Sequence, residues 1–171
     1  EYNGDVYETA GAIIEFADSR KEAFPDPESR QRVTEPGTIE DDVERRDFTV
    51  NMLMKDLSTG EMKDLTGTSI ADIQRGILRG HPGVDFNKIL RDDPLRMIRL
   101  IRFQAKYGWD VPLDVLRIVK SNAARIKIVS GERIRDELVK LMKIGKLHQA
   151  VRMMKTLGLL QYVLPEMEAM R

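Results

Sequence analysis

The sequence predicts an α+β fold, with short strands and helices in the first half and helices alone in the second. Three observations favour this: short apolar runs between turn residues before residue 83, an apolar period of three to four residues after it, and a charge that changes sign nearby. Residues 1–85 carry 10 Lys and Arg against 19 Asp and Glu, a net charge of −9. Residues 86–155 carry 17 against 7, a net charge of +10. Such asymmetry is typical of a protein that binds a polyanion with one region, although a solvated, Lys- and Arg-rich helical surface would give the same pattern.

The composition excludes several classes of protein. A chain of 171 residues, 42% of them hydrophobic, is long enough for one core or two small domains. It has no cysteine, so disulfides and thiolate metal sites are excluded, which fits a reducing compartment. No apolar run approaches the roughly 18 residues of a membrane span, and no signal peptide is recognisable. We therefore expect a cytoplasmic protein without a membrane partner.

The first part of the chain predicts a strand, a loop and a helix. Gly11–Phe16 is a short β-branched run and predicts a strand, whereas residues 25–37, rich in proline and charge, predict a mobile surface segment. Thr38 followed by Asp41 predicts an N-cap and a helix with an acidic first turn. We expect this helix to continue through residues 45–47.

The segment up to residue 83 predicts two further strands and a short helix. The strands are expected at residues 62–65 and 76–79, on either side of a turn at residues 64–67 and a polar helix at residues 69–75. Pro82 and Gly83 end this region.

The second half predicts four amphipathic helices. The first is indicated by Leu95, Ile98, Ile101 and Ala105, which recur at helical spacing. The others are expected at residues 113–124, 132–142 and 147–157, the last ending at Gly158.

One row of charged residues at the start of the basic region suggests base recognition. Asp93, Arg96, Arg99 and Arg102 recur every three residues, so a carboxylate acceptor and a guanidinium donor should lie side by side on one helix. Adenine and cytosine each present an amino donor beside a ring-nitrogen acceptor, and such a pair would accept them while leaving guanine or uracil with unpaired buried groups. Arg99 and Arg102 would then be free to bind phosphate. The alternative is structural: an Asp before Pro94 is an ordinary start for a helix, and the arginines could be a solvated face.

A second cluster is RRDFTVN at residues 45–51. Its arginine pair could clamp a phosphate, and Asp47 and Asn51, four residues apart, could contact a ribose hydroxyl from one helical face. By itself the cluster is a weak signal, because most RRD tripeptides are surface charge.

Together these segments resemble the ordered motifs of the class II tRNA nucleotidyltransferase and bacterial poly(A) polymerase family. GTIEDDVERRDFTVN resembles its ribose-binding motif and Asp64-Leu-Thr-Gly67 its head-to-neck motif; LRDDPLRMIRLIRFQAKYGW resembles its protein-template motif and SGERIRDELVKLM the neck motif that braces it. One departure is Asp92, where the family usually has Glu.

The resemblance implies roles for individual residues. Asp93 and Arg96 would be the amino-acid template for ATP and CTP. Arg46, Arg99 and Arg102 would contact the nucleotide, with Asp47 near the ribose and Asn51 supporting the site. The implied domains are a partial nucleotidyltransferase head at residues 1–83, a helical neck at 84–145 that selects nucleotides and binds RNA, and the start of a helical body at 146–171.

The implied activity is addition of CTP- and ATP-derived nucleotides to the 3′ end of tRNA with Mg²⁺. The family's Asp-x-Asp metal ligands do not occur in this chain, so we expect no catalytic residue in it and metal ligands upstream; Glu15 is a weak candidate for an extra carboxylate. The alternatives are an A-adding enzyme or poly(A) polymerase of the same family, or a non-catalytic helical RNA-binding module.

Overall fold

The computed structural model describes residues 6–9, 12–15, 17–23 and 33–169. They belong to two compact units, divided between Arg45 and Arg46. The boundary predicted near residue 83 lies inside the second unit.

The first unit consists of two antiparallel strand pairs and one helix. Strand β1 (Val6–Thr9) pairs with β2 (Ala12–Glu15), and β3 (Arg20–Ala23) pairs with β4 (Val33–Pro36). The predicted strand at 11–16 is therefore confirmed over its described residues. The prediction of a loop over 25–37 is wrong for residues 33–36, which form β4, while residues 24–32 lie outside the described part of the chain.

Helix α1 (Ile39–Glu44) packs against β3 and begins as predicted. The Thr38 hydroxyl accepts the backbone N–H of Asp41 at 3.1 Å, and the Asp41 carboxylate accepts the Thr38 N–H at 2.8 Å, which completes a capping box. The expectation that the helix carries residues 45–47 is wrong. The Asp47 carboxylate accepts the backbone N–H of Phe48 at 3.0 Å, and such a local side-chain bond competes with helical pairing.

The second unit opens with short elements. They are the 3₁₀ turn η1 (Thr49–Asn51), the hairpin of β5 (Met54–Lys55) with β6 (Met62–Lys63), and α2 (Ser69–Arg75). The predicted helix at 69–75 is confirmed, and the strand predicted at 62–65 is found at residues 62–63 but not at 64–65. The strand predicted at 76–79 is absent from the described structure, where Ile77 makes only a single bridge with Asp110.

Helices form the rest of the second unit, in the order α3 (Phe86–Asp92), α4 (Arg96–Tyr107), α5 (Leu113–Asn122), η2 (Ala123–Ile128), α6 (Gly131–Lys143), α7 (Leu147–Thr156), α8 (Leu160–Val163) and α9 (Pro165–Ala169). The four predicted helices correspond to α4, α5, α6 and α7, whereas α3 was not predicted. Gly158 has φ 73° after α7, the left-handed conformation expected of a residue that ends a helix.

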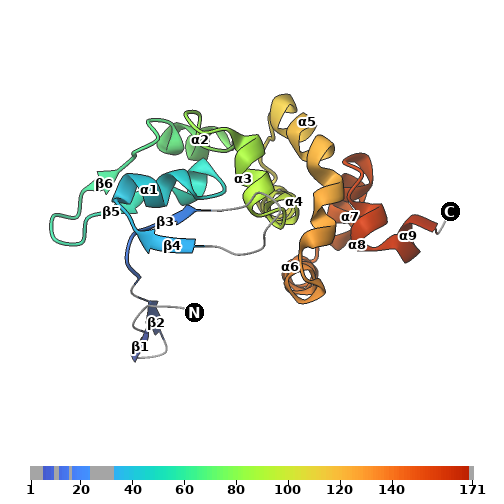
Figure 1. The fold of residues 1–171 in the computed structure, drawn as a ribbon, viewed down its shortest axis with the longest axis horizontal. Helices are drawn as coiled ribbons and strands as arrows, with labels where there is room; N and C mark the ends of the chain where they lie inside the picture. Colours follow the sequence, from blue (N-terminus) through green and yellow to red (C-terminus); the bar gives the residue numbers. More distant parts are fainter. Residues whose placement is uncertain (1–5, 10–11, 16, 24–32, 170–171) are drawn as a thin grey trace. The chain divides into compact units, whose positions relative to one another are not determined.

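Helix α4 is the central element of this unit and packs against both α6 and α7 (Figure 1). The predicted apolar stripe is buried, with Ile98 and Ile101 fully inaccessible. Phe48 and Leu78, from before residue 83, belong to the same core. Because the two predicted parts share one hydrophobic core, no break in packing occurs at residue 83.

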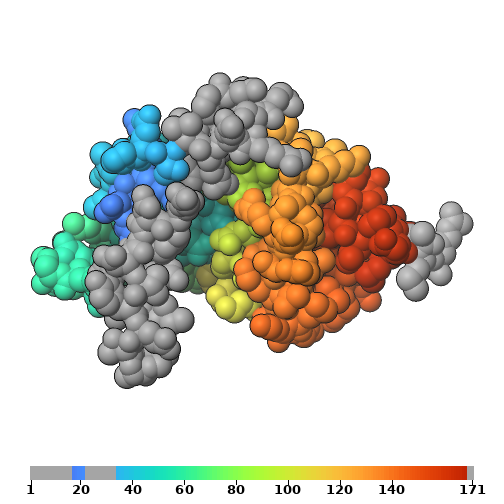
Figure 2. Space-filling model, turned by 60° about the horizontal axis from the view of Figure 1, so that its bottom comes forward, coloured from blue at the N-terminus to red at the C-terminus, as the bar shows by residue number. Residues whose placement is uncertain are grey.

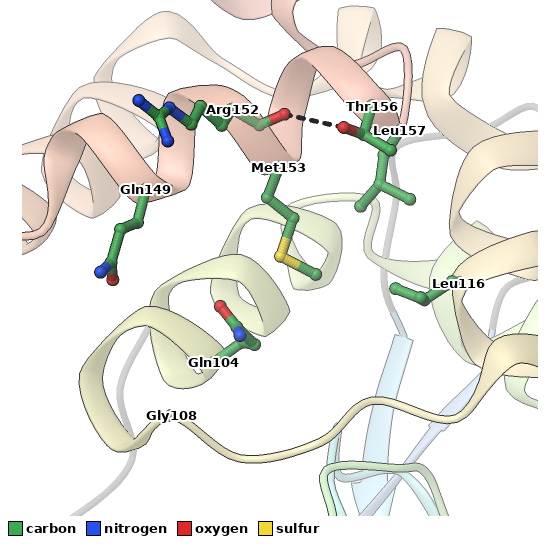
Figure 3. Close-up of a pocket in the computed structure, with 8 residues that line it drawn as sticks. All are labelled: Gln104, Gly108, Leu116, Gln149, Arg152, Met153, Thr156 and Leu157. Atoms are coloured by element: carbon green, nitrogen blue, oxygen red, sulfur yellow. Dashed lines mark hydrogen bonds between the residues drawn. The ribbon is translucent and has the colours of Figure 1, made fainter.

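The second unit has a continuous helical surface and a cavity between three of its helices. The helices from α5 to α8 form adjoining orange and red surfaces in Figure 2. Between α4, α5 and α7 lies a cavity of about 530 Å³ (Figure 3). Within the described residues, no helix has the length and apolar character needed to cross a membrane.

Candidate nucleotide-binding site

Asp93 lies between two helices rather than on one. It follows α3 in an extended conformation, with φ −144° and ψ 94°, and precedes the turn that leads into α4. Its carboxylate accepts the backbone N–H of Leu95 at 3.2 Å and the Arg133 guanidinium at 2.8 Å. The predicted arrangement of Asp93 and Arg96 on one helix is therefore wrong in detail, because Asp93 caps the turn before α4.

Arg96 is the first residue of α4 and is only 9% exposed, as is Asp93. Its guanidinium donates to the backbone carbonyl of Ile89 on α3 at 2.9 Å. Both proposed template side chains are thus close in sequence, largely buried and held by protein groups. A nucleobase could bind Asp93 and Arg96 only if it replaced some of these contacts with protein groups.

Asp47 and Arg99 connect the two sequence clusters across 52 residues. Arg99 Nε donates to Asp47 Oδ2 at 2.6 Å, and Asn51 Nδ2 donates to Asp47 Oδ1 at 2.9 Å. The Asp47 side chain is only 7% exposed. The predicted proximity of Asp47 and Asn51 is found, although a turn rather than a helical face produces it.

Arg46 also contributes to this cluster, since its guanidinium donates to the carbonyl of Asn51 at 2.6 Å. The structure therefore brings Arg46, Asp47, Asn51 and Arg99 together. Because the Asp47 carboxylate is buried and accepts bonds on both oxygens, a direct contact with ribose would require these bonds to open.

Arg102 is held by an acid that the sequence analysis did not assign to the site. Its Nε donates to Oε2 of Glu137 on α6 at 2.5 Å, and Lys140 donates to the other Glu137 oxygen at 2.8 Å. Burial alone would raise the pKa of Glu137, but hydrogen bonds from Lys140 and Arg102 outweigh it and hold the pKa below its ordinary value. Glu137 is thus an ionised anchor for Arg102.

Arg99 and Arg102, which we expected to be free to bind phosphate, are each paired with a buried carboxylate. Both guanidinium groups also lie over the ring of Phe103, at 5.9 and 4.7 Å from its centroid. Among the described residues, these bonds use only Nε, and the terminal nitrogens make no hydrogen bond. The two arginines are held in place yet keep donors that suit an oxyanion.

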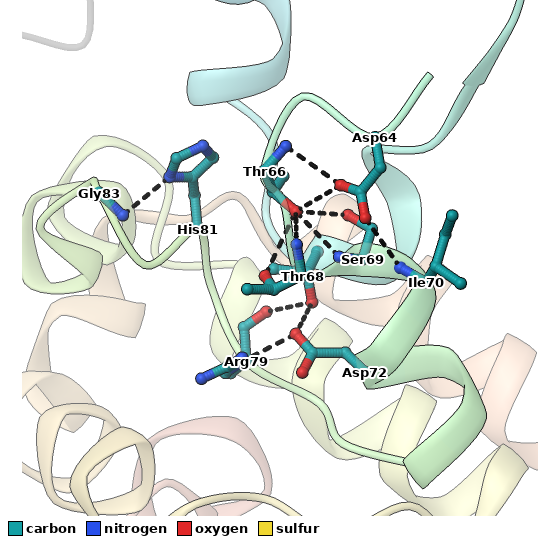
Figure 4. Close-up of polar contacts among 10 residues, drawn as sticks. Asp64, Thr66, Thr68, Ser69, Ile70, Asp72, Arg79, His81 and Gly83 are labelled. Carbon is teal, nitrogen blue, oxygen red and sulfur yellow. Dashed lines mark hydrogen bonds and ion pairs between the residues drawn. The ribbon is translucent and has the colours of Figure 1, made fainter. Parts of the chain in front are cut away.

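A polar network joins α2 to the segments before and after it (Figure 4). Asp72, 1% exposed, accepts the Thr49 hydroxyl at 2.8 Å and Arg79 Nε at 2.9 Å. The hydrogen bond with Asp72 raises the pKa of Arg79. Asp64, in the predicted turn at 64–67, accepts the N–H of Ile70 at 3.1 Å and so fixes the start of α2.

The described side chains contain no group of three or more His, Cys, Asp or Glu that could hold a metal ion. The side chain of Glu15, the weak candidate ligand, lies outside the described part of the structure. The described residues of this chain therefore do not fit a Mg²⁺ site.

Sequence reasoning from the residues missed Glu137, Arg133 and Asp72. One signal was available for Glu137: it lies three residues after Ile134 and four before Leu141, so an acid falls on the apolar face of α6. An acid on such a face requires a buried partner. No local pattern marks the partners of Arg133 and Asp72.

Two family models match the chain. Residues 3–79 match the poly A polymerase head domain, and residues 110–171 match a domain described as the probable RNA and SrmB-binding site of polymerase A. Among curated relatives, a tRNA nucleotidyltransferase of Schizosaccharomyces pombe is 31% identical over 91% of this chain and 32% of its own length. Poly(A) polymerase I of Salmonella typhimurium is 29% identical over 75% of this chain and 27% of its own length.

Solved structures agree. The CCA-adding enzyme of Bacillus stearothermophilus, solved in complex with CTP, has a TM-score of 0.77 and 26% identity over 92% of this chain and 37% of its own. The chain thus spans about a third of the length of the proteins it matches. With both domain models in the expected order, and relatives and solved structures that agree, the chain belongs to the family of tRNA nucleotidyltransferases and poly(A) polymerases.

Proposed function

We propose that this chain is the nucleotide-selecting and RNA-binding part of an enzyme that adds CTP- and ATP-derived nucleotides to the 3′ end of tRNA. The tRNA nucleotidyltransferase among its relatives and the CTP complex among its structural neighbours support this. The observation that carries the proposal is the 2.6 Å bond between Asp47 and Arg99, since it joins the RRDFTVN cluster to the helix that follows Asp93.

In this proposal, Asp93 and Arg96 select the base. The amino group of adenine or cytosine would donate to Asp93, and the adjacent ring nitrogen would accept from Arg96. The base would share or replace the Arg133 contact, which now occupies Asp93 Oδ2. A guanine or uracil would place a carbonyl against the carboxylate and a ring N–H against the guanidinium, so both buried groups would lose their partners.

Arg99 and Arg102 would hold the phosphates. Asp47 and Glu137 fix their Nε atoms, so the terminal nitrogens are oriented before the nucleotide arrives. Asp47 would therefore position Arg99, and Asn51 would support Asp47. Arg46 completes the cluster. This differs from the expectation that Asp47 itself contacts the ribose.

Mg²⁺ belongs to the proposed reaction as the metal expected of the family, with ligands that the described residues of this chain do not supply. A cytoplasmic location also stays a prediction, because the relatives include mitochondrial enzymes.

A poly(A) polymerase is the second candidate, favoured by the similarity to poly(A) polymerase I. The two are separated by product length. A tRNA transcript without its 3′ terminal nucleotides is incubated with labelled CTP and ATP and the protein expressed from its complete coding sequence. Addition that stops after a defined short sequence supports our proposal, whereas a long ladder with ATP alone contradicts it. RNA binding without addition would indicate a non-catalytic module.

A further inference from the structure

The cavity beside α7 combines an apolar floor with polar groups at its rim. It lies between α4, α5 and α7 and has a volume of about 530 Å³, within the range of small-ligand sites. Leu116 from α5 and Met153 from α7 provide apolar surface. Gln104 points from α4 toward α7, and Gln149 points from α7 toward α4 (Figure 3).

Three polar side chains that line this cavity have no partner among the described residues. Among the described residues, no hydrogen bond or ion pair involves the side-chain amides of Gln104 and Gln149 or the guanidinium of Arg152. The backbone carbonyl of Arg152 accepts the Thr156 hydroxyl at 3.0 Å, but its side chain is exposed. The cavity therefore offers two amides and one cation to a ligand.

Basic residues outnumber acidic ones on the three helices around the cavity, where Asp114 at the start of α5 is the single acid. Residues 115–131 contain four Lys and Arg, residues 138–165 contain five, and neither segment contains Asp or Glu. The pKa of Arg79 is raised mainly by its hydrogen bond to Asp72 and to a smaller extent by the charge of Asp114, which lies two residues before Leu116. These two segments form much of the adjoining orange and red surface in Figure 2. Such a surface is complementary to a polyanion.

We propose that this cavity binds one unpaired nucleotide of a single-stranded RNA. The face of the base would pack on Leu116 and Met153, its polar edge would meet the two glutamine amides, and Arg152 would bind a neighbouring phosphate. Glutamine amides donate and accept, so they suit a base edge better than a phosphate alone. This inference rests on the proposed function only in naming RNA as the polyanion, and the cavity is distinct from the cluster around Asp47 and Arg99.

The test is fluorescence anisotropy of a short, fluorescein-labelled single-stranded RNA, titrated with the chain at several salt concentrations. Arg152→Ala should raise Kd about fivefold and reduce the slope of log K against log salt by about 0.7, the value for one phosphate contact on a single strand. The double variant Gln104→Ala/Gln149→Ala should raise Kd by a similar factor without changing the slope, since it removes uncharged contacts. All three side chains lie at the cavity rim, so circular dichroism should show an unchanged fold.

Arg135→Ala is the matched control, because Arg135 is an exposed cation elsewhere on the surface, 3.4 Å from Asp136. It should change Kd less than twofold. The proposal is overturned if Arg135→Ala and Arg152→Ala weaken binding equally, if the glutamine variant has no effect, or if a duplex of the same sequence binds as tightly. None of these results bears on whether the enzyme adds nucleotides to tRNA, which is measured separately by product length. Failure of this proposal and failure of the proposed function are therefore distinguishable.

Discussion

Replacing Glu137 by glutamine should lower the free energy of unfolding of the second unit by about 2 kcal/mol at pH 7. The Glu137 side chain is 3% exposed and accepts charged hydrogen bonds from Arg102 at 2.5 Å and Lys140 at 2.8 Å. Glutamine has one acceptor oxygen and one NH2 donor, so it can accept from only one of the two cations. A hydrogen bond to a charged group contributes about 1.5–3 kcal/mol, and losing one costs about 2 kcal/mol. For a chain of this length the midpoint of thermal unfolding should fall by about 6 °C.

The assay is urea unfolding followed by the fluorescence of Trp109, the one tryptophan in the sequence, which stacks on Tyr107 in the second unit. Asp136→Asn is the control, since that neighbouring side chain is 61% exposed and its ion pair spans 3.4 Å. It should change the free energy of unfolding by less than about 0.5 kcal/mol.

The effect of Glu137→Gln should also depend on pH. Because the folded chain holds the pKa of Glu137 below its ordinary value, the ionised side chain stabilises the fold above the unfolded pKa of about 4.3. This stabilisation is lost as pH falls through the folded pKa. The difference between wild type and Glu137→Gln should therefore be constant near neutrality and shrink in acid. Equal effects of Glu137→Gln and Asp136→Asn at pH 7 would refute the proposed anchor. A stability difference between wild type and Glu137→Gln that grows in acid would refute it too.

Three further substitutions probe other parts of the account. Asp47→Asn should weaken ATP binding about tenfold by loosening Arg99 without unfolding the chain, which calorimetric titration and circular dichroism would check together; unchanged affinity would contradict the positioning role. Asp72→Ala removes the acceptor of Arg79, whose side chain is 36% exposed, and should destabilise the second unit by about 1.5 kcal/mol in a urea titration; a change below about 0.5 kcal/mol would count against the network. Thr38→Ala removes one half of the capping box and should lower the free energy of local opening of α1, measured by amide hydrogen exchange, by about 1 kcal/mol. Exchange in α4 should stay unchanged.

Local patterns were sufficient to predict much of the fold. Helix α2 was predicted with its observed bounds, and the Thr38 capping box and the apolar stripe of α4 follow from spacing alone. Each of these features depends on residues within one or two helical turns. Sequence is therefore a sufficient guide where the deciding interactions are local.

Other features depend on partners far along the chain. Ile77 was predicted in a strand, but its single bridge joins it to Asp110, 33 residues later. Helix α3 was not predicted, although Asp85 caps it by accepting the Asn87 N–H. Short elements of this kind are stabilised by packing, in this case of Phe86 in the shared core.

The candidate site shows the same limit. Spacing identified Asp93, Arg96, Arg99 and Arg102 as a group, but it could not show that Arg99 pairs with Asp47, 52 residues earlier. For that reason Arg99 and Arg102 were expected to be free to bind phosphate, and the buried carboxylates that hold both of them were not predicted.

Base selection by Asp93 and Arg96 is the central step of the proposed function. The direct measurement is a competition between ATP or CTP and GTP or UTP for addition to a tRNA transcript, with the complete enzyme that carries this chain. We predict that Asp93→Ala lowers the preference for ATP and CTP about a hundredfold, because GTP and UTP no longer leave a buried carboxylate unpaired. Asp92→Ala should keep the preference. An Asp93→Ala enzyme that adds nucleotides and still rejects GTP and UTP as the wild type does would contradict the account.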